Sequence, residues 1–275
     1  MISDEVIPII FRNLDEIRYR VIRVLALFMV LFGIFIVFSI RLVTVFGHSF
    51  YFIYPDVYHN LGAQLLSRIE LMILPPGTQL IVVKPADGLT ADAYIAMFLA
   101  LILTMPYLIY HVSMFLGPAL KRNEKVLLKA ILVPASLLFF AGAMMGLFWV
   151  APAMFSIFNE FDLGLGATTT MSLMNFVSFL VLYLLAFGVS FEVPVFMYGL
   201  TRAGMVRAGF WSENWRYAVV GSLLFGFLVS PGVTGFMEVM MALPMIALYF
   251  GGVFFSRRYE KKFKSDESKT VSEPF

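Results

Sequence analysis

The amino-acid sequence predicts an all-α membrane protein in which six helices cross a bilayer. Apolar residues make up 60% of the chain, whereas soluble domains contain about 45 to 50%. These residues are gathered in long runs separated by polar connections. The basic residues gather on alternate connections, which is typical of multi-spanning proteins.

The first predicted span is 21–40. The segment Asn13-Leu-Asp-Glu16 before it has the form of a capping box and predicts a helix that begins there and continues into the span. Residues 41–88 are predicted to form a long outer-face loop, because glycines and prolines interrupt them repeatedly. Within this loop, 61–73 is predicted to be a short amphipathic helix. Four apolar residues share one side of it, namely Leu65, Leu66, Ile69 and Met72.

The second and third spans are predicted at 93–110 and 127–150, with a charged loop at 121–125 between them. We expect the third span to end before Pro152, because proline removes a backbone donor and interrupts a helix. Residues 153–171 are then predicted to be a loop.

The last three spans are predicted to be the runs 172–200, 217–229 and 236–255. The fifth is short: at 1.5 Å per residue it covers roughly 20 Å of a hydrocarbon core about 30 Å thick. We expect Pro244 to break the sixth span. The predicted organisation is one membrane domain, residues 1–258, followed by a charged cytoplasmic tail, residues 259–275, that is disordered beyond Lys264.

Glu192 is the only charged residue in the fourth predicted span. A carboxyl group at membrane depth costs roughly 2.5 to 3.5 kcal/mol on insertion scales. Pro194 follows two residues later, removes a backbone donor and frees a carbonyl near Ser190. The pair predicts a helix that bends around a polar site inside the membrane.

The distribution of basic residues predicts the orientation. All but three of the 20 lysines and arginines lie on the side of the two termini. Because cytoplasmic loops carry the excess of basic residues, both termini are predicted to be cytoplasmic. The three exceptions are Arg41, Arg68 and Lys84.

Several classes of function are disfavoured by residues that the sequence lacks. There is no cysteine, and the three histidines lack metal-ligand spacing. Phosphate-binding loops and the HExxH and GxSxG motifs are also absent. We therefore expect no enzyme activity, no cofactor, no metal and no nucleic-acid partner.

Three functions remain open on the residues alone. The chain is a receptor and scaffold, a proton-coupled secondary transporter that uses Glu192, or an assembly protein in which Glu192 only ties helices together. No internal repeat is visible, which argues against the commonest transporter architectures.

Two carboxylates on the predicted cytoplasmic side are candidates for binding a cationic ligand. Glu16 precedes the first span, and Glu124 lies in the loop before the third. Together they form an acidic spot within a basic surface. Such a spot suits arginine, because a carboxylate accepts two parallel hydrogen bonds from one guanidinium.

Four motifs, in order, resemble those of the TatC family, the multi-spanning core subunit of the twin-arginine protein translocase. The first is Asn13-Leu-Asp-Glu-Ile-Arg-Tyr-Arg20 before the first span, and the last is Gly252-Val-Phe-Phe-Ser-Arg257 at the end of the sixth. The loop motif comprises Phe115, Pro118, Leu120 and Glu124. The span-four motif comprises Phe187, Gly188, Phe191, Glu192 and Pro194. The resemblance covers nearly the whole chain.

The resemblance implies a curved, glove-like bundle of six helices in the cell membrane. It implies that twin-arginine signal peptides of folded precursors bind at the cytoplasmic face, through Glu16, Arg18 and Glu124, with Phe115 and Pro118 shaping the loop. It further implies homo-oligomers, TatA-like and possibly TatB-like single-span partners, and export driven by the proton-motive force. Glu192, with Pro194, is then expected to contact a partner helix within the bilayer.

The sequence departs from the family pattern in four places. Asn13 replaces a histidine, and Ile17 replaces a leucine. Ser230-Pro-Gly-Val-Thr234 lacks the aspartate that usually follows the proline, and Phe250 stands where a carboxylate is frequent. The resemblance therefore predicts a divergent member with altered polar roles on the outer face and in span six, where Glu238 is a candidate for the missing charge.

Overall fold

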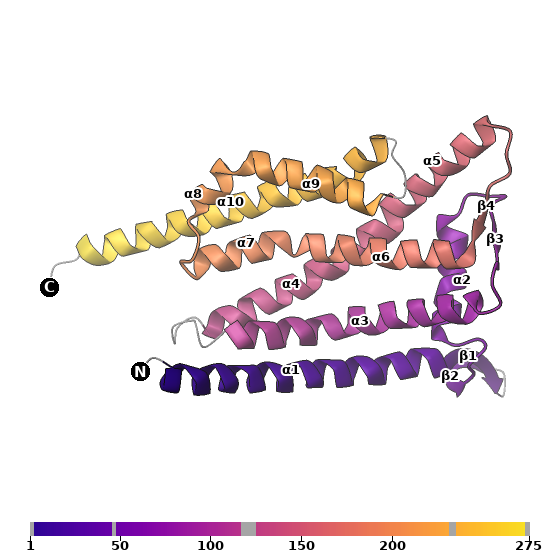
Figure 1. The fold of residues 1–275 in the computed structure, drawn as a ribbon, viewed down its shortest axis with the longest axis horizontal. Coiled ribbons are helices and arrows are strands. Elements are labelled where there is room, and N and C mark those ends of the chain that lie inside the picture. Colours follow the sequence, from indigo (N-terminus) through magenta and orange to yellow (C-terminus); the bar gives the residue numbers. More distant parts are fainter. Residues whose placement is uncertain (1–2, 46–47, 117–124, 231–234, 273–275) are drawn as a thin grey trace. The chain divides into compact units, whose positions relative to one another are not determined.

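The computed structural model describes residues 3–45, 48–116, 125–230 and 235–272 (Figure 1). The chain forms two compact units, one from 1–119 with 151–181 and the other from 120–150 with 182–275. Within the described residues, five helices are long and apolar enough to span a membrane, and a sixth apolar helix is shorter. The prediction of an all-α membrane protein is confirmed.

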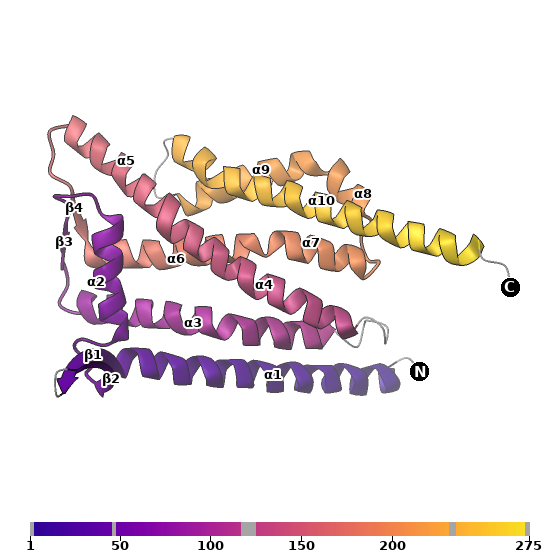
Figure 2. The same cartoon turned by 180° about the vertical axis from the view of Figure 1, so that it is seen from behind.

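In the first unit, α1 (Ser3–Val37) packs along α3 (Asp87–Leu116), as Figures 1 and 2 both show. The capping-box prediction was wrong, because α1 begins about three turns before Asn13. The span also ends at Val37 and not at residue 40. Its last predicted residues join a run of aromatic and β-branched side chains, which prefer the extended backbone of a strand.

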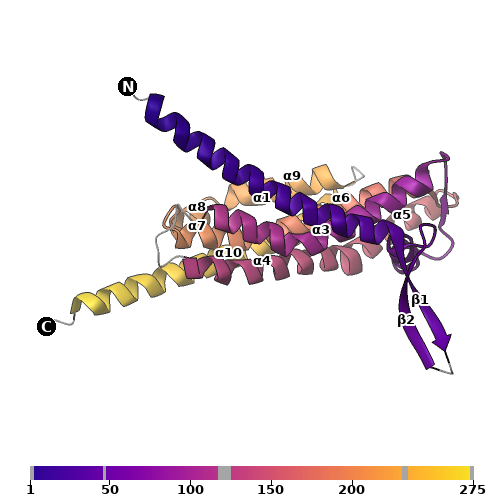
Figure 3. The same ribbon diagram turned by 90° about the horizontal axis from the view of Figure 1, so that it is seen from below.

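That run forms an antiparallel hairpin that the sequence analysis missed. Strand β1 (Phe38–Val45) pairs with β2 (His48–Pro55), with Phe38 opposite Pro55 and Val45 opposite His48. Figure 3 shows the hairpin leaving the end of α1. Apart from Phe38, its described apolar side chains are exposed, Tyr51 by 78% and Ile53 by 63%.

Asp56 ties the base of the hairpin together. Its carboxylate pairs with Arg41, whose guanidinium lies 5.6 Å from the ring centre of Tyr54. Desolvation raises the pKa of Asp56, but two backbone N–H groups and the Arg41 and His59 side chains donate hydrogen bonds to the carboxylate. Together these hydrogen bonds hold the pKa of Asp56 below its usual value of 3.8.

Helix α2 (Leu61–Ile73) has the predicted bounds. Its buried side differs in part from the predicted one, because Ile73 is buried and Met72 is exposed. Asn60 caps the helix: its Oδ1 accepts from the Ala63 N–H, and its Nδ2 donates to the carbonyl of Ile36 and to Asp92. This one buried side chain therefore joins the end of α1, the start of α2 and α3.

The first unit is completed by α5 (Ala151–Gly164), the start of α6 (Leu173–Phe191) and a short parallel pair. The pair consists of β3 (Gln79–Ile81) and β4 (Thr170–Ser172). The predicted loop at 153–171 was therefore wrong for its first two-thirds. A wider helical turn at Gly146–Val150 precedes Pro152, and the helix continues past the proline because such a turn changes the backbone hydrogen-bond pattern where the proline N–H is missing.

The second unit contains α4 (Lys125–Met145), the rest of α6, α7 (Val193–Arg202), α8 (Ala208–Glu213), α9 (Trp215–Val229) and α10 (Phe236–Ser272). Helices α9 and α10 pack side by side (Figures 1 and 2). The short fifth span is confirmed, since α9 has only 15 residues.

Helix α10 is longer than predicted at its C-terminal end. It passes Pro244 and Lys264 and ends at Ser272, so the predicted break and the predicted disorder beyond Lys264 were both wrong. A helix that already exists in the span needs no new nucleus to continue. The Lys, Arg and Glu residues that follow are good helix formers.

Candidate functional site

The first candidate region is the terminal-side end of α1, where Arg18 is exposed. Next to it, Arg23 Nη2 donates to the Tyr19 hydroxyl, and the Arg23 guanidinium lies 4.1 Å from the centre of the Tyr19 ring. Glu16 belongs to the same helix, but its side chain lies outside the described part of the structure. This end of α1 therefore presents an exposed surface of cationic and aromatic groups.

The end of α3 lies beside this part of α1. His111, in the vicinity of Arg20 and Arg23, is buried against the rings of Tyr107 and Tyr110 at 4.4 and 5.4 Å between ring centres. The two helices run in opposite directions at this contact. Glu16 lies one turn before Arg20, and Phe115 lies one turn after His111.

The structure thus places the part of α1 that carries the first motif beside the end of α3, where the second motif begins at Phe115. Phe115 is in the last turn of α3, with its side chain outside the described part, and Pro118 and Glu124 lie outside the described residues altogether. The sequence analysis did not identify His111 as part of this contact. The only available signal was its position near the end of an apolar run.

The second candidate region is the junction of α6 and α7 at Glu192. The Glu192 N–H donates to the Val189 carbonyl at 3.0 Å, and the Glu192 carbonyl accepts from the Phe196 N–H at 2.9 Å. Pro194 is buried in the first turn of α7, where its lack of an N–H costs little. The predicted interruption of the fourth span is therefore confirmed as a junction of two helices.

The Glu192 side chain is partly buried, and its Oε1 has no hydrogen-bond partner among the described residues. Its side chain also makes no cap to α7. A buried carboxyl oxygen without a donor is costly, so a donor from another molecule would be favoured at this position.

One glycine of the fourth-span motif and one glycine of α4 bring α4 and α6 into close contact. A Cβ on Gly188 would lie 2.7 Å from the Phe139 ring, and one on Gly142 would lie 2.7 Å from the Phe187 carbonyl oxygen. Phe187 is itself buried. Phe187 and Gly188 of the motif therefore pack α6 against α4, and Glu192 is the polar residue of the motif.

Helix α10 approaches the same junction. A Cβ on Gly252 would lie 2.7 Å from Met197 Sδ and 3.1 Å from Pro194 Cα. The polar site at Glu192 is thus held between helices whose backbones approach at glycines. Such a site is rigid, because the helices leave little room for rearrangement.

Glu238 is a second buried carboxyl in this unit. Both of its oxygens lack a hydrogen-bond partner within the described residues, and its backbone lies against Gly226 of α9. The sequence analysis gave Glu238 only as a candidate for the missing span-six charge. Phe250, at the departure from the family pattern, contacts the rings of Trp215 and Tyr249. Residues 231–234, where the other departure falls, lie outside the described residues.

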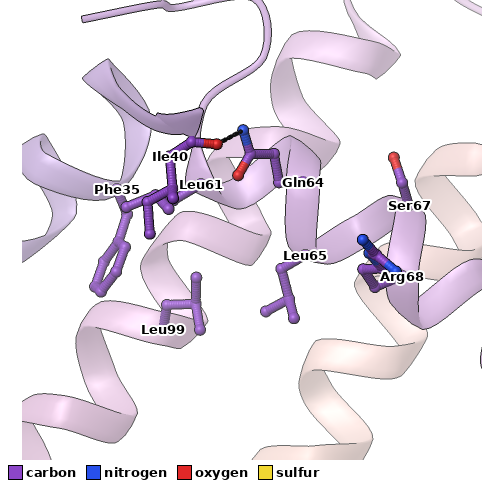
Figure 4. Close-up of a pocket in the computed structure, with 8 residues that line it drawn as sticks. All are labelled: Phe35, Ile40, Leu61, Gln64, Leu65, Ser67, Arg68 and Leu99. Carbon is purple, nitrogen blue, oxygen red and sulfur yellow. Dashed lines mark hydrogen bonds between the residues drawn. The ribbon is translucent and has the colours of Figure 1, made fainter. Parts of the chain in front are cut away.

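A pocket of about 590 Å³ lies in the first unit, between α1, α2 and α3. Figure 4 shows its lining, in which Gln64 donates to the Ile40 carbonyl and Phe35, Leu65 and Leu99 supply apolar walls. Arg68 is its only charged residue. Across the described part of the chain, no cluster of three or more His, Cys, Asp or Glu residues is arranged to hold a metal.

Comparisons with known proteins identify the family. A family model described as Sec-independent protein translocase protein (TatC) matches residues 12–244. A protein of that name from Cenarchaeum symbiosum (strain A) is 35% identical over 254 residues, which are 92% of this chain and 96% of the relative. One from Escherichia coli (strain K12) is 33% identical over 213 residues, 77% and 80% of the two chains.

Solved structures agree. A crystal structure of the twin-arginine translocase receptor TatC matches with a TM-score of 0.69 at 26% identity, over 89% of this chain and 98% of that one. A second crystal structure of this receptor, in DDM, matches with a TM-score of 0.72. These relatives are named as translocase proteins, not as enzymes. The chain belongs to the TatC family and is a multi-spanning membrane subunit of the twin-arginine translocase.

Proposed function

We propose that this chain is the receptor subunit that binds twin-arginine signal peptides of folded precursors at the cytoplasmic face. Glu16 and Glu124 accept hydrogen bonds from the two arginines of the peptide. Arg18, which is exposed on the same helix, belongs to the same binding surface, and Phe115 and Pro118 shape the loop that carries Glu124. Each arginine of a di-arginine motif can donate two parallel hydrogen bonds to one carboxylate.

The observation that carries this proposal is the contact between α1 and the end of α3. His111 of α3 lies within reach of the charges of Arg20 and Arg23 on α1. Glu16 and Phe115 are one turn beyond this contact on their own helices. The end of α3, which precedes the segment that carries Pro118 and Glu124, therefore lies beside the turn that carries Glu16.

The membrane orientation follows from the same proposal. Both termini are cytoplasmic, because nearly all lysines and arginines lie on their side of the spans. The chain works within an oligomeric complex in the cell membrane, and export draws on the proton-motive force. The crystallised relatives are described as receptors, which supports the same role here.

Glu192 and Pro194 form the contact for a partner helix. The partners are small TatA-like and possibly TatB-like single-span proteins. A buried carboxyl oxygen without a donor, at a rigid junction of two helices, suits a polar group on a neighbouring membrane helix. Family membership favours this role over the proton-coupled transporter that the residues alone left open.

The experiment is binding of a fluorescent twin-arginine signal peptide to the full chain in nanodiscs, with a Lys-Lys peptide for comparison. We expect selective binding to the wild type and its loss in Glu124→Ala. Glu213→Ala is the control, because Glu213 is an exposed carboxylate at the end of α8, on the same predicted face. Equal binding of both peptides would show that the protein recognises only positive charge, and this result would overturn the proposal.

A further inference from the structure

A basic and aromatic pocket lies where α7 and α10 leave the membrane spans. It has a volume of about 440 Å³ and belongs wholly to the second unit. Three cations line it, Arg202 of α7 with Arg258 and Lys262 of α10, and its other lining residues are aromatic. Neither Glu16 nor Glu192 is among its lining residues.

Two tyrosines hold Arg202 in place. Arg202 Nη1 donates to the Tyr198 hydroxyl at 3.2 Å, and the guanidinium lies 5.9 and 5.5 Å from the ring centres of Tyr198 and Tyr259. The Arg202 Nε is buried and has no acceptor among the described residues. The side chain is therefore pre-ordered and keeps donors available, which lowers the entropic cost of binding an anion.

Among the described residues, no carboxylate lines the pocket to balance its charge. Glu260, on the same helix, is engaged elsewhere, because its Oε2 accepts from the Ala208 N–H at 2.9 Å. Three positive charges at one opening attract a phosphate-bearing group.

The location indicates which phosphate-bearing group fits. Arg202 ends the apolar helix Leu173–Arg202, and the apolar part of α10 gives way to charged residues from Arg257 onward, next to the lining residue Arg258. Phe255, another lining residue, is 57% exposed and provides an apolar wall. Cations at the membrane surface above exposed aromatic groups match a charged head attached to acyl chains.

We propose that this pocket binds the headgroup of an anionic glycerophospholipid. The phosphate diester accepts hydrogen bonds from Arg202. Arg258 and Lys262 lie on either side of it, and the acyl chains extend past Phe255. A bound lipid would hold α7 and α10 together at the membrane surface.

The test is native mass spectrometry of the full chain in detergent, titrated with phosphatidylglycerol or phosphatidylcholine. The informative variant is the double change Arg258→Gln and Lys262→Gln, because both side chains are exposed and their loss leaves the packing intact. The matched control is Arg216→Gln, an exposed arginine of the same unit that lies outside the pocket, with its guanidinium 5.8 Å from the Trp215 ring.

We expect one phosphatidylglycerol to bind more tightly than phosphatidylcholine. Its dissociation constant should rise by roughly fivefold for each cation removed, and stay within about twofold in the control. Equal affinity for both lipids, an unchanged double variant, or an equal loss in Arg216→Gln would overturn the proposal. Competition by glycerol 1-phosphate at the same concentration as the lipid would overturn it too, because the site would then select a small phosphate and not a lipid.

Discussion

Gly188 of α6 lies directly against the ring of Phe139 of α4, where a Cβ would come within 2.7 Å of Cε2. Three residues after Phe139 on α4, Gly142 leaves the same kind of space for the carbonyl oxygen of Phe187, the residue that precedes Gly188. Small residues at helix contacts are how membrane helices approach closely, since the bilayer supplies no hydrophobic force between them. The contact positions the helix that leads into Glu192.

Gly188→Ala should therefore destabilise the protein. We expect a loss of about 1 to 3 kcal/mol, because the added methyl group must displace a buried ring. Denaturant titration in detergent, followed by circular dichroism, measures it. Gly221→Ala is the control: nothing lies within 4 Å of its Cβ position in α9, and alanine is a better helix former by about 1 kcal/mol. Equal stability of Gly188→Ala and the wild type would show that the helices are not close-packed here.

Glu16→Gln should weaken binding of the twin-arginine peptide, whereas Asp15→Asn should not. The two carboxylates are sequence neighbours and carry the same charge, so the comparison separates position from net charge. Loss of a hydrogen bond to a charged group costs about 1.5 to 3 kcal/mol, which is roughly 10- to 150-fold in affinity. Fluorescence anisotropy in nanodiscs measures it, and an equal effect of the two changes would contradict the assignment of Glu16.

Glu192→Gln should reduce retention of a single-span partner without lowering stability. The buried Oε1 has no donor among the described residues, so an amide of the same shape costs little in the isolated chain. Co-purification with a TatA-like protein and thermal unfolding in detergent give the two measurements. Glu238→Gln serves as the control, since it also removes a buried carboxyl with unpartnered oxygens. A drop in stability with unchanged partner retention would instead support a purely structural role for Glu192.

Arg41→Gln should raise the pKa of Asp56. Asp56 has a lowered pKa in the folded protein, so its contribution to stability is present above the unfolded value near 3.8 and is lost as the pH falls through the lower folded value. Removing one hydrogen-bond donor to the carboxylate brings the pKa of Asp56 in the folded protein closer to its unfolded value. Infrared titration of a carboxylate-labelled protein measures the pKa, with Arg68→Gln as a control that leaves Asp56 untouched. An unchanged pKa in Arg41→Gln would show that the pair is not formed in solution.

Local chemistry was predicted well where it depends on a few neighbouring residues. The bounds of α2, the shortness of α9 and the interruption at Glu192 and Pro194 all follow from nearby prolines, glycines and apolar runs. Helix ends were predicted less well. A wider turn allows the helix to continue past Pro152. The helix of the last span continues past Lys264 because it needs no new nucleus there. Neither effect is visible in composition alone.

The sequence by itself determined the class of molecule, the number and approximate position of its spans and the residues of its motifs, because hydrophobic length, proline and charge act locally. Only the tertiary structure decided which distant side chains meet. Asn60 reaches Asp92 across 32 residues, Gly188 meets Phe139, and Arg202 joins Arg258 and Lys262 at one pocket. Such contacts depend on how side-chain volumes fit between packed elements, and the sequence of one element does not contain that information.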